Sequence, residues 1–206
     1  MSNTTPIVEA AFATPIYSTS TEAYLTLNEY LIKKHLNRVQ PNFEGNVTTR
    51  DHYLLEDEKL NSMKDWFQYN INHFVHEILG IKKTLKFYIT QSWMNYNYPG
   101  TSHHSHFHRN SFISGTYYLK GDAPIIFEKQ MDWTQHFEFD FEKPTIFSGE
   151  QFHVSPKPGT MLLFPSNLRH RVAPNHSDDM RVSIAFNVFF KGEIQGEKDA
   201  LTRLTI

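Results

Sequence analysis

The feature that most constrains the fold is a series of short strand-like segments between residues 85 and 190, separated by turn signals. The strand candidates are residues 86–97, 112–119, 124–128, 152–155, 160–165 and 181–190. The turn signals are Pro99-Gly100, Lys120-Gly121-Asp122, Ser148-Gly149 and Pro158-Gly159. Several short strands at this spacing predict a sandwich or jelly roll. The aromatic content of 15% agrees with a β-rich fold, because aromatic side chains are enriched in strands.

The first third of the chain has helical spacing instead. One predicted helix carries Tyr24, Leu27 and Leu31, and a second carries Leu60, Met63, Phe67, Ile71, Phe74 and Ile78. Gly80 stands just past the second helix, where a stop signal is expected. Helices with one apolar face bury that face against a sheet. We therefore expect an α+β domain, mainly β, with the helices packed on one outer face of the jelly roll.

The length of 206 residues suits a single domain with a sizeable core. We expect a helical N-terminal part at residues 1–84, a β-barrel core at residues 85–190 and a tail at residues 191–206. Residues 129–143 mix charged and aromatic side chains within the strand series. We interpret this stretch as an inserted loop that could serve as a lid.

Composition excludes several classes of protein. The chain has no cysteine, which rules out disulfides, thiolate nucleophiles and zinc–thiolate sites. Its formal net charge of −2 gives no general attraction to nucleic acid or to anionic membranes, so neither partner is expected. No apolar run approaches the ~20 residues that span a bilayer. Met1–Ala13 lacks the basic start and apolar core of a signal peptide, which predicts a cytoplasmic location.

A histidine cluster at residues 103–108 is the most informative stretch for function. In a regular strand, His104, His106 and His108 would face one side, with His103, Ser105 and Phe107 on the other. Two imidazoles two residues apart on a strand can chelate one metal ion, and imidazole suits iron, zinc, copper and nickel. The alternative is a solvent-facing, histidine-rich loop.

A second informative stretch follows the apolar strand candidate 160–165. His170 lies just beyond it, and Arg181 and Ser183 come later on one face of the last strand candidate. An arginine beside a hydroxyl forms a receptor for a carboxylate. The rest of that strand is apolar on both faces, so an inward guanidinium would be costly without an anionic partner. An ordinary surface ion pair of Arg181 is the alternative.

The order and spacing of these residues resemble the 2-oxoglutarate- and iron(II)-dependent oxygenases. The stretches that carry the resemblance are Trp93–Gly100, His106-Phe107-His108, Ser114–Leu119, Phe164-Pro165-Ser166 with His170, and Arg181–Asn187. The sequence looks most like a group of such oxygenases carried by phages and marine bacteria, similar in barrel plan to the prolyl hydroxylases. The resemblance covers residues 90–190, about half of the chain.

This resemblance implies a double-stranded β-helix, a cupin-like jelly roll, with Fe(2+) as cofactor and 2-oxoglutarate as co-substrate. His106 and His170 match the family's two iron-binding histidines, and Arg181 matches the residue that pairs with the distal carboxylate of 2-oxoglutarate. Ser183 lies beside that arginine. His108 falls where most relatives carry an acidic ligand, so a three-histidine set is expected here.

Two tyrosines complete the site that the resemblance implies. Tyr118 and Tyr98 fall where prolyl-hydroxylase-like relatives place tyrosines near the co-substrate. Two registers are possible for the pair of early ligands, and His106 with His108 is preferred over His104 with His106. The first pair lies nearer the strand candidate 112–119, which should be deeper in the barrel.

The implied function is that of a dioxygenase that hydroxylates a small molecule or a peptide, using molecular oxygen. If the protein is phage-encoded, its place is the host cytoplasm. The choice between a monomer and a homodimer stays open. Two rivals stay open at this stage. One is a cupin-like three-histidine dioxygenase without 2-oxoglutarate, which would not need Arg181. The other is a non-catalytic jelly-roll module, which would hold a structural metal with a closed coordination sphere.

Overall fold

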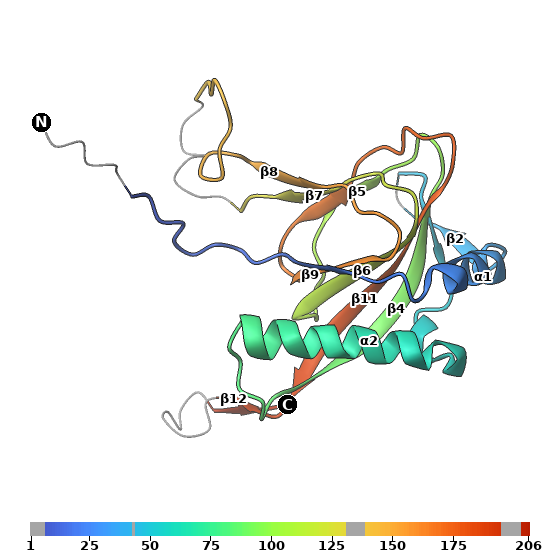
Figure 1. Ribbon diagram of the computed structural model, residues 1–206, viewed down its shortest axis with the longest axis horizontal. Coiled ribbons are helices and arrows are strands. Elements are labelled where there is room, and N and C mark those ends of the chain that lie inside the picture. The colour runs from blue at the N-terminus through green and yellow to red at the C-terminus, as the bar shows by residue number, and fades with distance from the viewer. Residues whose placement is uncertain (1–6, 43, 131–138, 195–202) are drawn as a thin grey trace, which may run out of the picture.

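The computed structural model describes residues 7–42, 44–130, 139–194 and 203–206. Two antiparallel sheets lie face to face and form a double-stranded β-helix, as predicted (Figure 1). The larger sheet has the order β1 (Tyr17–Ser20), β9 (Thr160–Pro165), β6 (Ile113–Lys120), β11 (Arg181–Lys191), β4 (Lys86–Asn97), β3 (Val47–Thr49), β2 (Val39–Pro41). The smaller sheet has the order β5 (His103–His106), β10 (His170–Val172), β7 (Ile125–Glu128), β8 (Gln151–Val154).

The helices cover the outer face of the larger sheet. They are α1 (Leu25–His35), α2 (Asn61–Asn72), a π-helical extension η3 (His73–Ile78), and two short 3-10 turns, η1 (Leu54–Glu56) and η2 (Glu58–Leu60). Figure 1 shows α2 running across the strands of this sheet. The ring of Phe67 on α2 lies 4.9 Å from that of Phe186 on β11 and 5.4 Å from that of Tyr117 on β6. These contacts build the main apolar core.

A second, smaller core lies between the two sheets. It contains Tyr118, Ile125, Phe127, Leu162, Phe164 and Leu168. Strand β6 contributes to both cores, since Tyr117 points toward the helices and Tyr118 toward the smaller sheet. This alternation explains why β6 is buried along almost its whole length. The central strands are covered on both faces, so no solvated face remains to interrupt the pattern.

Most of the predicted strands are confirmed, two of them with the same bounds, β4 and β9. The N-terminal part is not purely helical, however, because β1, β2 and β3 lie within residues 1–84 and join the larger sheet. These strands are only three or four residues long, which is too short for a clear alternation. In the tail, β12 (Glu193–Ile194) pairs with β13 (Leu204–Thr205). Residues 131–138, the middle of the predicted inserted loop, lie outside the described residues.

Strand β5 departs from the regular alternation that the sequence predicted for the histidine cluster. His106 pairs with His170, but His103 pairs with Val172, so three steps on β5 match two steps on β10. This irregularity is a β-bulge, in which one extra residue changes the face to which the following side chains point. Moreover, β5 ends at His106, so His108 lies beyond the strand. The prediction that His104, His106 and His108 share one face of a regular strand is therefore wrong.

No helix in the described part of the chain has the length and apolar character needed to cross a membrane.

Candidate functional site

Three histidines converge between the two sheets. His106 on β5 and His170 on β10 are direct partners in the smaller sheet, and their ring centroids are 4.4 Å apart. The backbone N–H of His108 donates to the carbonyl of Ser166 at 2.9 Å, which holds the segment after β5 against the end of β9. One ring nitrogen from each of the three histidines lies within 4.8 Å of those of the other two. A single metal ion could therefore be bound by all three.

Each of these three imidazoles is held by its Nδ1 atom. Nδ1 of His106 donates to the carbonyl of His104 at 2.8 Å, and Nδ1 of His170 donates to the carbonyl of Leu168 at 2.9 Å. Nδ1 of His108 donates to the side-chain oxygen of Asn187 at 2.6 Å. Because these oxygens only accept hydrogen bonds, the proton resides on Nδ1 and the Nε2 lone pair is free. Such outer contacts orient histidines that ligate metals.

The same three side chains are neutral near pH 7. Burial lowers the pKa of His106 to about 4 and holds the pKa of His170 well below its usual range. Burial also lowers the pKa of His108, against the opposing effect of its hydrogen bond to Asn187. A neutral imidazole with a free lone pair is the form that binds a metal ion. The cluster thus needs no deprotonation step to accept one.

No carboxylate joins the three histidines within the described residues. The nearest acidic side chain along the smaller sheet, Glu128, accepts a hydrogen bond from Ser105 at 2.5 Å. It also lies 3.7 Å from Arg169 and 3.6 Å from Arg171, which engage its two oxygens. Glu128 is therefore occupied on the other side of the strands. The ligand set near the cavity consists of nitrogen donors.

His103 also lines the cavity, contrary to the prediction that it faces the other side of the strand. The β-bulge is the physical reason, since it turns His103 and His106 toward the same space, with ring centroids 4.4 Å apart. Burial lowers the pKa of His103 to about 3, with further lowering by the neighbouring His106. His104, which the regular alternation favoured, is absent from the lining of the cavity.

Arg181 lies in the same cavity, at the start of β11. Its side chain is buried, with 2% exposed. Nε donates to the carbonyl of Ala123 at 3.1 Å, and Nη1 donates to the side-chain oxygens of Asn97 at 3.1 Å and Ser183 at 3.3 Å. The guanidinium also lies 4.9 Å from the centre of the Tyr118 ring. The predicted pair of Arg181 and Ser183 thus lines this cavity with its side chains in contact.

The charge of Arg181 lacks an anionic partner among the residues that the structure describes. Burial lowers the pKa of its guanidinium, which reflects the cost of a charge away from water. Gly121 allows the chain to turn closely over this residue, because a Cβ there would lie 2.8 Å from the Cα of Arg181. A buried cation of this kind is a receptor for a carboxylate ligand.

The two predicted tyrosines differ in position. Tyr118 is fully buried behind Arg181, and burial raises the pKa of its phenol. Tyr98 lies outside the cavity lining, with 36% of its side chain exposed, so the structure does not bring it to the site. Tyr98 comes after the end of β4, where the chain turns toward Gly100 and away from the barrel.

The sequence prediction missed two residues that contact His108, namely Trp93, which lines the cavity, and Asn187, which does not. The ring of Trp93 stacks on that of His108 with the centroids 5.9 Å apart, and the side-chain oxygen of Asn187 accepts a hydrogen bond from Nδ1 of this histidine. Both could have been predicted from the two-residue alternation of side chains along a strand. Asn187 shares a face of β11 with Arg181 and Ser183, and Trp93 shares a face of β4 with Asn97.

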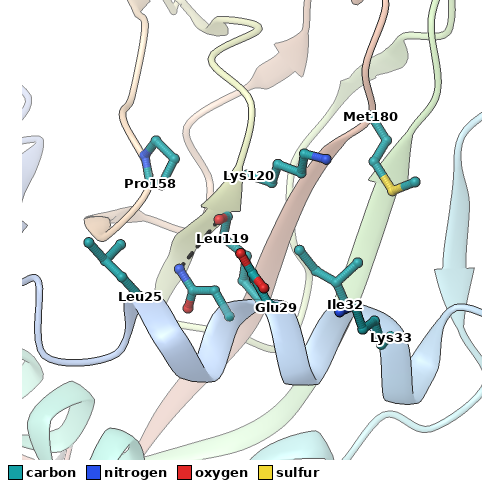
Figure 2. A pocket seen from close by; sticks show the side chains of 9 residues that line it. Leu25, Glu29, Ile32, Lys33, Leu119, Lys120, Pro158 and Met180 are labelled. Atoms are coloured by element: carbon teal, nitrogen blue, oxygen red, sulfur yellow. Dashed lines mark hydrogen bonds between the residues drawn. The ribbon is translucent and has the colours of Figure 1, made fainter.

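A larger pocket lies elsewhere on the molecule, between α1 and the ends of β6 and β9 (Figure 2). Its volume is about 490 Å³, and the carbonyl of Leu119 in its wall accepts a hydrogen bond from Asn28 at 3.3 Å. Its charged groups are Glu29, Lys33 and Lys120, the last of which is paired with Asp179. This groove contains no converging set of metal-binding groups. The histidine cavity is therefore the candidate site in spite of its smaller size.

Comparisons with known proteins concern the same part of the chain. Residues 91–187 match the family model described as "Putative 2OG-Fe(II) oxygenase". The matched range runs from β4 to β11 and includes the three converging histidines and Arg181. No curated protein sequence matches the chain.

Solved structures of low sequence identity share the fold. The prolyl-4-hydroxylase of Pseudomonas putida is 18% identical over 84% of this chain and 92% of its own, with a TM-score of 0.55. HygX of Streptomyces hygroscopicus, solved with nickel and 2-oxoglutarate, is 11% identical over 85% and 82%, with a TM-score of 0.55. The epimerase SnoN of nogalamycin biosynthesis, solved with Fe3+, α-ketoglutarate and nogalamycin RO, is 9% identical over 93% and 90%, with a TM-score of 0.60.

Proposed function

We propose that this chain is a 2OG-Fe(II) oxygenase, as the match of residues 91–187 to that family model supports, and that it hydroxylates a small molecule or peptide with 2-oxoglutarate as co-substrate. One observation carries the proposal: three neutral imidazoles and an unpaired, buried guanidinium line one cavity. The first set suits a divalent metal and the second suits a carboxylate. 2-Oxoglutarate is a dicarboxylate that can contact both.

The residues fit Fe(2+) by the chemistry of their donors. His106, His108 and His170 would hold the ion through Nε2, since Nδ1 of each is already engaged. Imidazole nitrogen is a suitable donor for iron(II), and three protein ligands leave positions open for other molecules. The set differs from the commoner two histidines and one carboxylate, so one more positive charge remains at the site. When bound, iron(II) supplies the oxidising chemistry with 2-oxoglutarate and dioxygen.

The residues also fit 2-oxoglutarate. Arg181 would bind the distal carboxylate, with Ser183 beside it, and Tyr118 would support the guanidinium through its ring. The residues of the chain therefore bind and orient the co-substrate rather than transfer protons. Trp93 and the apolar lining of the cavity, including Ile125, Phe164 and Val172, would keep water from the reacting atoms.

Anaerobic binding tests this proposal directly. Fe(2+) and then 2-oxoglutarate are added to metal-free protein, and the weak visible charge-transfer band of the chelate is measured. We expect the band in the wild-type protein, and succinate formation after oxygen is admitted. Arg181→Ala serves as the matched control, because it leaves the histidines in place. A protein that binds Fe(2+) but not 2-oxoglutarate would contradict the proposal and favour a three-histidine dioxygenase without this co-substrate.

A further inference from the structure

His103 differs from the three converging histidines in its hydrogen bonding. Nδ1 of His106, His108 and His170 each donates to an oxygen of the protein. Neither ring nitrogen of His103 forms a hydrogen bond to another residue in the described part of the chain, although its ring contacts those of His104 and His106. The side chain is partly buried and lines the cavity. A polar group in this position is available to a ligand.

The position of His103 is set by the β-bulge of β5. His103 and His106 are three residues apart, and on a regular strand they would face opposite sides. The bulge brings their ring centroids to 4.4 Å. Bulges often lie next to active sites, where they redirect a side chain. Here the redirected side chain enters the cavity that also contains Arg181.

His103 lines the same cavity as two groups that the proposed function uses. One is the metal cluster, through the neighbouring ring of His106, and the other is Arg181. A ligand that reaches from the metal to the guanidinium would lie in the cavity that His103 lines. 2-Oxoglutarate carries only oxygen acceptors, whereas a neutral imidazole always offers one N–H donor. The two are therefore complementary.

We propose that His103 donates a hydrogen bond to 2-oxoglutarate and is a further binding residue for the co-substrate. This inference rests on the proposed function and adds a donor that lies outside the metal-ligand set and outside the arginine pocket. In this proposal the imidazole binds and orients the dicarboxylate, and His106, His108 and His170 hold the metal. The ring nitrogens of His103, His104 and His106 also lie within 4.8 Å of one another, so a metal held by that group is the rival reading that the test must separate.

His103→Phe tests the inference, because phenylalanine fills similar space without a donor. The protein is loaded with cobalt(II), and binding of 2-oxoglutarate is measured by anaerobic calorimetry. We expect the dissociation constant of 2-oxoglutarate to rise about tenfold or more, as for a lost hydrogen bond to a charged group. The cobalt(II) affinity and the unfolding midpoint should stay at the wild-type values. His103→Gln, which keeps a donor, should recover part of the affinity.

His104→Phe is the matched control, since His104 is the adjacent histidine on the same strand and does not line the cavity. It should bind 2-oxoglutarate as the wild type does. Wild-type affinity in His103→Phe would overturn the inference and leave the proposed function intact. Loss of cobalt(II) in that variant would also overturn it, by making His103 a metal ligand. If wild-type protein itself fails to bind 2-oxoglutarate, the proposed function is wrong, and the inference is wrong with it.

Discussion

Gly115, in the middle of β6, offers a sharp test of the packing that supports the site. A Cβ built at this position would lie 2.0 Å from Cζ and 2.2 Å from Cε2 of Phe186. Phe186 is fully buried, and the ring of Phe67 on α2 lies 4.9 Å behind it. The ring of Phe186 therefore occupies the place of a side chain on β6. Glycine is required here for close approach rather than for a special backbone angle.

The cost of Gly115→Ala follows from this geometry. Carbon atoms pack at about 3.5–4.0 Å, so the Phe186 ring would have to retreat by roughly 1.5 Å into Phe67. Overpacking a core costs about 1–3 kcal/mol, and a clash with a ring that is blocked from behind belongs at or above the upper end. We expect Gly115→Ala to lower the free energy of unfolding by about 3 kcal/mol or more.

Urea unfolding of a double-mutant cycle measures this cost. Phe186→Ala alone should destabilise by about 3–5 kcal/mol, because it leaves a cavity. In that background Gly115→Ala should be close to neutral, since the new methyl group enters vacated space. The two substitutions should therefore show a coupling energy of about 3 kcal/mol or more. A cost below about 1 kcal/mol for Gly115→Ala in the wild type would refute the reasoning.

Other predictions concern the site. His170→Ala should abolish stoichiometric iron binding and leave the fold intact by circular dichroism; retained iron would remove His170 from the ligand set. His108→Asp should keep iron and His108→Ala should lose much of it, whereas metal loss on His104→Ala alone would show that the ligand pair is His104 with His106. Arg181→Ala should weaken 2-oxoglutarate binding by about 2–5 kcal/mol in calorimetry; equal affinity would exclude Arg181. Asn187→Leu should lower metal affinity about 10–100-fold, as measured by competition with a chelator, because it frees the His108 ring.

The metal-free protein should also lose stability in acid. The pKa of His106 is lowered by burial from 6.5 to about 4, so the folded state binds fewer protons than the unfolded chain between these values. The free energy of unfolding contributed by this group is complete above pH 6.5 and falls as the pH decreases toward 4. The slope is about 1.4 kcal/mol per pH unit for each such histidine. A urea midpoint that does not change over this range would contradict the burial of the cluster.

The longer strands of the barrel could be predicted from the sequence because their residues follow simple local patterns. Strands β4 and β9 have clear length, alternation or apolar character, and their bounds matched. Arg181 and Ser183 were found because two residues on one strand share a face. The short strands β1, β2 and β3 were missed because their pairing is set by distant partners, such as β9 for β1, rather than by their own pattern.

The β-bulge of β5 lies beyond local prediction for the same reason. It exists only relative to β10, where His103 and His106 pair with Val172 and His170. Reading β5 as a regular strand put His103 on the wrong side. His108 still reached the cluster, but through the chain after the strand and the hydrogen bond to Asn187, not through strand alternation.

The groups that would contact the two ends of 2-oxoglutarate belong to different sheets. His106 and His170 are on the smaller sheet, while Arg181 and Ser183 are on the larger one. A ligand bound by groups of both sheets would link the two sheets across the barrel. Elsewhere the two sheets contact each other through apolar side chains. The strands that carry the histidines have only four and three residues, so they have few ladder bonds of their own to resist sliding. A ligand bound in the cavity would then fix the distance between the two sheets. Amide hydrogen exchange in β5 and β10 should therefore be slower when the ligand is bound than when it is absent.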